Sequence, residues 1–198
     1  LVRGDQRTTI GGGRGAGPSG AIMQDGDAIY LAGDGASPEG DRPFLDRLNL
    51  RTLIAERLFR SDSKSFETPI AMLSGNGRSV LTRAETVTDP PNYYTRALGA
   101  GTSRHAVTAF SDPQEFFRGV QRQFITYERK DGVKLSATLY LPPGYTKGER
   151  LPVIMWAYPR EFSDADTASQ VVGSPNRFTL VTPGNSHMYL LCAGYAIL

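Results

Sequence analysis

Between residues 133 and 141, apolar and polar side chains alternate along the chain. The apolar positions are Val133, Leu135, Ala137, Leu139 and Leu141, and the polar positions are Lys134, Ser136, Thr138 and Tyr140. A period of two is typical of a half-buried strand. Asp131-Gly132 precedes it, and glycine accepts the positive φ of a tight turn. We therefore expect a β-hairpin whose first strand is formed by residues 124–129.

A second pattern follows, in which apolar residues are consecutive. Pro142-Pro143-Gly144 ends the hairpin, and residues 151–158 then form an apolar run. Such a run is typical of a strand covered on both faces, as in a parallel sheet. Residues 186–193 are a short helical candidate that Gly194 would end, and residues 195–198 resemble the next buried strand. Strand, crossover and strand predict a parallel pair and an α/β domain.

The first half of the chain contains two imperfect repeats about fifty residues apart, a spacing typical of β-propeller blades. In the first repeat, residues 21–23 lead to a turn at 24–27, and in the second, residues 69–73 lead to a turn at 74–77. The strands expected after these turns are residues 28–32, 44–50 and 53–59 in the first repeat, and 79–84, 92–98 and 105–110 in the second. Four antiparallel strands per repeat predict a propeller blade.

Composition narrows the possible partners. The chain has 198 residues, a net charge of +2 and one cysteine, Cys192. This charge does not favour a nucleic-acid or membrane partner. No run of about 18 apolar residues is present, so no membrane-spanning helix is expected. No cluster of residues has metal-ligand spacing, and we expect no cofactor.

The order of these parts, with several short motifs, resembles the prolyl oligopeptidase family of serine peptidases and, within it, the glutamyl endopeptidase-type members. The motifs lie at residues 42–47 (RPFLDR), 67–69 (ETP), 89–93 (DPPNY), 131–145 (DGVKLSATLYLPPGY), 156–162 (WAYPREF) and 173–176 (GSPN). The resemblance implies that residues 1–118 are the C-terminal blades of a β-propeller. Residues 119–198 would begin an α/β-hydrolase catalytic domain.

The family resemblance also implies a function. We expect the parent protein to be a serine peptidase that hydrolyses short or unfolded peptides through an acyl-enzyme, with a preference for cleavage after Glu. The nucleophilic Ser and its Asp and His would lie beyond this chain, so the chain alone would be inactive. Two alternatives stay open: an esterase or acyl-transferring α/β-hydrolase, and a non-enzymatic propeller module that binds a partner. The oligomeric state is left open.

Three residues are candidates for the site. By the resemblance, Tyr158 occupies the place of a tyrosine that donates its O–H to the oxyanion of the tetrahedral intermediate. Such a donor can lower the barrier by roughly 3–4 kcal/mol. The apolar pattern alone instead favours Tyr158 as a core aromatic. Cleavage after an acidic residue requires a cation in the pocket, and Arg160 and Arg177 are candidates because guanidinium matches carboxylate in geometry. A solvated loop arginine is an equally good interpretation of each.

No nucleophile elbow of the form G-x-S-x-G occurs in the sequence. A triad of Ser186, His187 and Asp164 is a weak alternative, because adjacent residues on one helical turn point to different faces. We expect His187 to be a helix-surface or core-edge residue and His105 an ordinary blade residue.

Overall fold

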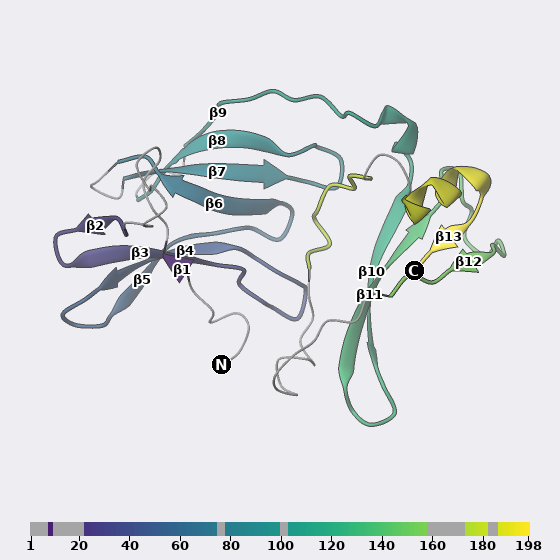
Figure 1. Cartoon of the computed structure of the whole chain (residues 1–198), viewed down its shortest axis with the longest axis horizontal. Coiled ribbons are helices and arrows are strands. Elements are labelled where there is room, and N and C mark those ends of the chain that lie inside the picture. Colours follow the sequence, from purple (N-terminus) through teal and green to yellow (C-terminus); the bar gives the residue numbers. More distant parts are fainter. Residues whose placement is uncertain (1–7, 10–21, 75–77, 100–102, 158–172, 182–185) are drawn as a thin grey trace.

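The structure is a computed structural model that describes residues 8–9, 22–74, 78–99, 103–157, 173–181 and 186–198. Its strands form three sheets, two of which lie within residues 8–106. Figure 1 shows these two sheets side by side, with a long hairpin and a smaller group of elements standing apart from them. No helix in the described ranges is long and apolar enough to cross a membrane.

The first sheet is the first predicted blade. Its strands are β1 (Thr8–Thr9), β2 (Gln24–Asp25), β3 (Ala28–Gly33), β4 (Phe44–Asn49) and β5 (Ala55–Arg60). The order is β1-β3-β4-β5, all antiparallel, and β2 pairs with β3 as well. Of the turn predicted at 24–27, only Gly26 and Asp27 form a turn, because Gln24 and Asp25 belong to β2.

The start of β5 differs from the prediction. Leu53 and Ile54 lie in the turn after β4 rather than in a strand, and Leu53 has a φ of 57°. The Asn49 side chain explains the shift, because its Oδ1 accepts hydrogen bonds from the backbone N–H groups of Arg51 and Thr52 at 2.9 and 3.0 Å. An asparagine that caps a turn in this way lengthens the loop at the expense of the strand.

The second sheet is the second predicted blade, with four antiparallel strands in sequence order. They are β6 (Phe66–Met72), β7 (Ser79–Glu85), β8 (Asn92–Ala97) and β9 (Arg104–Ala106). The predicted last strand at 105–110 is wrong in its second half. There the Asn92 Oδ1 accepts the Phe110 N–H at 2.6 Å and the Thr108 hydroxyl at 2.8 Å, so a side chain takes the place of a strand partner.

The two blades share one apolar core. Tyr30 and Leu45 from the first sheet and Met72 and Val80 from the second are buried together. Inside the second blade Glu67 is also buried, and its carboxylate accepts hydrogen bonds from Arg96 at 2.9 and 2.7 Å. The prediction of propeller blades is confirmed by these sheets and by the comparisons below.

The third sheet contains the predicted hairpin and the parallel pair. Its strands are β10 (Gln121–Glu128), β11 (Lys134–Leu141), β12 (Val153–Ile154) and β13 (Ala196–Ile197), in the order β10-β11-β13-β12. The hairpin is confirmed, as is the parallel pairing of β12 with β13. The predicted short helix is the 3-10 helix η3 (His187–Ala193), which Gly194 ends at a φ of 85°.

The expectation that the run at 151–158 is covered on both faces is wrong for its described part. β12 is an edge strand of only two residues, and Val153, Met155 and Trp156 are exposed. Ile154 alone packs on the second apolar core, which includes Met188 and Leu191 of η3. Among the described residues one face of β12 is therefore covered, and the other faces solvent.

Residues 173–181, called the connecting segment below, run between the blades and the third sheet (Figure 1). The segment has no regular secondary structure, but several of its residues are hydrogen-bonded to neighbouring segments. The backbone N–H of Asp41 donates to the Gly173 carbonyl at 2.5 Å, and the Asn176 amide donates to the Ser63 carbonyl at 3.0 Å. At its end, the Val181 N–H donates to the side chain of Gln114, which lies just before the 3-10 helix η2 (Glu115–Phe117), at 2.7 Å.

Candidate functional site

A cavity of about 780 Å³ lies between the second blade and the third sheet. Its walls come from the end of β7, from β10 and β11, from residues 155–157, from the 173–180 part of the connecting segment, and from η3 and β13. Residues from three parts of the sequence, 83–85, 122–157 and 173–198, thus meet around one cavity. This is where the two predicted domains face each other.

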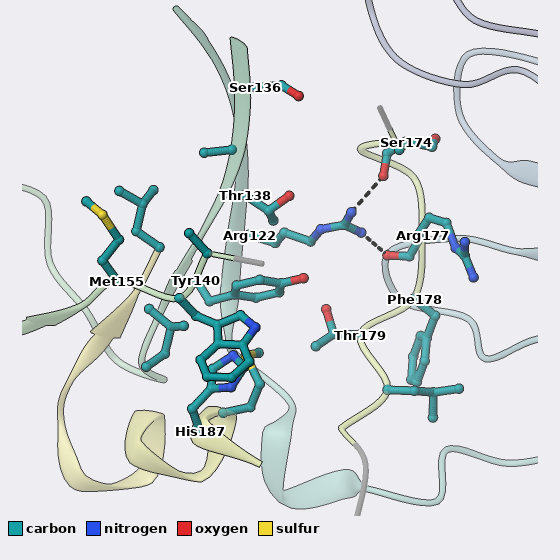
Figure 2. A pocket seen from close by; sticks show the side chains of 18 of the residues that line it. Arg122, Ser136, Thr138, Tyr140, Met155, Ser174, Arg177, Phe178, Thr179 and His187 are labelled. Carbon is teal, nitrogen blue, oxygen red and sulfur yellow. Dashed lines mark hydrogen bonds between the residues drawn. The ribbon is translucent and has the colours of Figure 1, made fainter. Parts of the chain in front are cut away.

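The alternation of β11 gives the cavity a polar wall. Ser136, Thr138 and Tyr140 are two residues apart on this strand, so they lie on the same face of the sheet, and all three line the cavity. Figure 2 shows these side chains facing Ser174, Arg177 and Thr179 across the space. The pattern that predicted the hairpin therefore also places a row of hydroxyl groups on the cavity.

Arg177, a predicted substrate-binding residue, lines the cavity but is engaged with a carboxylate. Its Nε lies 3.0 Å from the Glu85 Oε1, a carboxylate buried at the end of β7. The N–H does not point at that oxygen, so the contact is an ion pair rather than a hydrogen bond. Arg83 lies 3.6 Å from the same oxygen. The role of Arg177 in substrate binding stays a prediction.

Arg122 was not singled out in the sequence, yet this residue of β10 lines the cavity. Its terminal nitrogens donate to the carbonyl oxygens of Ser174, at 2.7 Å, and of Arg177 (Figure 2). Burial lowers the pKa of the Arg122 guanidinium below its ordinary value; nearby Arg177 lowers this pKa too, whereas Tyr140 and Glu85 raise it. The register of the predicted hairpin could have indicated that Arg122 lies beside the polar face of β11, because Arg122 pairs with Tyr140.

His187 lies at the lower edge of the cavity as a core-edge residue and stacks on Trp156 at 4.7 Å between ring centroids. Ser186 is the N-cap of η3, and its Oγ accepts the Met188 N–H at 3.3 Å. This bond gives Ser186 a structural role, and Asp164 lies outside the described residues. His105 lies exposed in β9.

Tyr158 and Arg160 also lie outside the described residues, and Ala157, which lines the cavity, is the last residue described before them. Their roles stay predictions. In the described ranges no group of three or more His, Cys, Asp or Glu side chains could hold a metal ion.

Comparison with curated proteins shows which proteins this chain is similar to in sequence. The chain is 39% identical over 184 residues to a protein of Oryza sativa subsp. japonica named "Probable glutamyl endopeptidase, chloroplastic". The chain is related to glutamyl endopeptidases. An Arabidopsis thaliana protein of the same name is 38% identical over 177 residues, and these two matches cover 86% and 84% of this chain. The chain spans only about a fifth of these glutamyl endopeptidase relatives, 19% and 18% of their lengths. No protein-family model matches it.

Solved structures of peptidases share the fold. Oligopeptidase B from Trypanosoma brucei superposes with a TM-score of 0.56 at 16% identity, covering 98% of this chain and 25% of that one. Oligopeptidase B from Leishmania major gives 0.57 at 11% identity, covering 89% and 23%. At such identities the likeness shows the fold alone. Together with the two glutamyl endopeptidase relatives, it confirms the family resemblance that the sequence motifs predicted.

Proposed function

We propose that the protein carrying this chain is a serine peptidase that cleaves peptides after acidic residues. The observation that carries this proposal is the relationship to glutamyl endopeptidases over 86% of the chain. The cavity between the second blade and the third sheet supports it, because a concave space between two domains suits a short peptide. The chain supplies blades and the first strands of the catalytic sheet, with the boundary near residues 118 and 119.

The proposed chemistry is acyl transfer. A serine outside this chain attacks the peptide carbonyl, and a histidine, also outside it, accepts the proton. Tyr158 is proposed to donate its phenol O–H to the oxyanion, together with a backbone N–H. Such a donor acts only as negative charge develops, and therefore raises kcat more than it lowers KM.

The test replaces Tyr158 by Phe in the full-length protein and measures hydrolysis of fluorogenic peptides with Glu before the scissile bond. We expect kcat to fall by about 10²- to 10³-fold with little change in KM. Tyr145→Phe is the matched control, since it removes the same hydroxyl from a loop where the Tyr145 oxygen accepts the Gly148 N–H at 3.4 Å. An unchanged kcat for Tyr158→Phe would exclude the oxyanion role. Cleavage of acyl esters but not of peptides would favour the esterase alternative.

A further inference from the structure

Among the described residues that line the cavity, arginines outnumber carboxylates. Three arginines line it, Arg83, Arg122 and Arg177, and the only described carboxylate in its walls is Glu85. Both Arg83 and Arg177 lie within ion-pair distance of Glu85. Arg177 is further fixed by its position over the Phe66 ring, with 4.7 Å from the guanidinium carbon to the ring centroid. The charges of these two arginines are therefore already partly compensated.

Arg122 is different. In the described part of the chain no carboxylate lies within 4.0 Å of it, and its two hydrogen-bond acceptors are neutral backbone carbonyls. Its Nε is buried without a hydrogen-bond partner among the described residues. Desolvation of this partly buried guanidinium outweighs the attraction of Glu85, which lies beyond ion-pair distance, so the Arg122 pKa is lowered. An anion bound beside Arg122 would supply a direct counter-charge.

The surroundings of Arg122 suit a carboxylate. The hydroxyl groups of Thr138 and Tyr140 lie on the same wall, and Thr179 faces them from the connecting segment (Figure 2). Hydroxyl groups can each donate one hydrogen bond to a carboxylate oxygen. The Tyr140 ring centroid is 6.0 Å from the Arg122 guanidinium carbon, so the ring also shields the charge from solvent on one side.

We propose that Arg122 is the specificity-determining residue that binds a carboxylate of the peptide substrate, with the hydroxyl groups of Thr138 and Tyr140 completing the subsite. The proposal rests on the proposed peptidase function. The carboxylate has two possible sources in a peptide, an acidic side chain or the free C-terminus. Both present the same planar group to a guanidinium.

The experiment measures kcat/KM of the full-length protein and of its Arg122→Met variant with four matched peptides. The peptides carry Glu or Gln before the scissile bond, each with a free or an amidated C-terminus. We expect Arg122→Met to lower kcat/KM for the preferred carboxylate peptide by at least about tenfold while leaving its neutral isostere nearly unchanged. If Arg122→Met lowers kcat/KM only for the two Glu peptides, Arg122 binds the acidic side chain. If it lowers kcat/KM only for the two peptides with a free C-terminus, Arg122 binds the C-terminal carboxylate.

Equal losses on all four peptides would overturn the proposal, because Arg122 would then only fix the connecting segment through the Ser174 and Arg177 carbonyls. Arg42→Met is the matched control, since Arg42 also donates to a backbone carbonyl, that of Ser61 at 3.1 Å, away from the cavity. Should Arg122→Met not fold, Arg122→Lys keeps the charge without the planar fork. It should retain part of the Glu-to-Gln discrimination, and full retention would speak against bidentate binding by Arg122.

Titration calorimetry separates this proposal from the proposed function. If the unaltered protein hydrolyses none of the peptides, the peptidase proposal fails by itself. Binding of the Glu and Gln peptides to the unaltered and Arg122→Met proteins then still tests the subsite. Equal affinities of the unaltered protein for both members of the Glu/Gln and acid/amide pairs would exclude a carboxylate subsite.

Discussion

Gly40 offers a direct test of how the first blade is joined to the cavity wall. It has a φ of +107°, and a Cβ added there would lie 2.6 Å from the Gly173 carbonyl oxygen. Pro175 Cδ and Ser174 Cα would lie at 3.1 and 3.2 Å. All three neighbours belong to the connecting segment, and the closest is backbone, which cannot rotate away. Gly40→Ala should therefore push residues 173–175 off the blade.

The loss of folding stability expected for Gly40→Ala is the sum of three contributions. Positive φ costs an alanine roughly 1–2 kcal/mol wherever it occurs. The clash adds an overpacking cost of about 1–3 kcal/mol, and displacement of Gly173 weakens the 2.5 Å hydrogen bond from the Asp41 N–H, for about 1 kcal/mol more. Gly148→Ala is the matched control, because Gly148 has a φ of +100° and nothing within 4 Å of the added Cβ.

We expect Gly40→Ala to destabilise the protein by about 2–4 kcal/mol more than Gly148→Ala does, an additional decrease of about 4–16 °C in Tm. Differential scanning calorimetry of the full-length variants measures this difference. Hydrogen exchange should also become faster at the Phe178 and Val181 amides, which are bonded to Glu85 and Gln114. Equal decreases in Tm for the two variants, with unchanged exchange in residues 173–181, would refute the reasoning.

Two further predictions concern charged pairs. Arg96→Met leaves the buried Glu67 carboxylate with Thr82 and Arg104 as its partners among the described residues, at 2.6 and 3.5 Å, and should destabilise the second blade by about 3 kcal/mol. Thermal unfolding checks it, and the Arg96→Met, Glu67→Leu double variant should recover much of the loss; no recovery would contradict the buried-charge explanation. At the hairpin tip, the hydrogen bond from Arg129 lowers the pKa of Asp131 to about 2. Since this pKa is lowered on folding, the pair stabilises the protein fully above the ordinary value of 3.8 and less as pH falls through about 2. The Tm difference between the unaltered protein and Arg129→Gln should therefore be constant above about pH 5 and shrink below pH 3; a constant difference down to pH 2 would refute it.

Local pattern was sufficient where a segment's structure depends on its own residues. The alternation in 133–141 and the Asp131-Gly132 turn predicted the hairpin, and Gly194 predicted the end of η3. Both blades were also predicted, because strand spacing and turn residues recur. Two errors in strand bounds lie where a side chain competes with the backbone, as Asn49 does at the last residue of β4 and Asn92 at the first residue of β8.

The candidate site was less predictable. Arg177 was chosen as a candidate because a guanidinium matches a carboxylate, but a sequence does not show that Glu85, 92 positions earlier, lies 3.0 Å from it. Nor does it show that Arg122 has no such partner among the described residues, because the distinction depends on which segments meet around the cavity. Pairing between distant charges is a property of three-dimensional position alone.

The sequence by itself determined most strands and turns of this chain, the family it resembles and the polar face of β11, since these depend on period, turn chemistry and short motifs. Only the tertiary structure decided that β13 lies between β11 and β12, and that the connecting segment joins both blades to the third sheet. It also decided which of the cavity's arginines lacks a carboxylate partner among the described residues. The reason is physical: local preferences act within a few residues, whereas burial and charge compensation depend on neighbours that folding brings together.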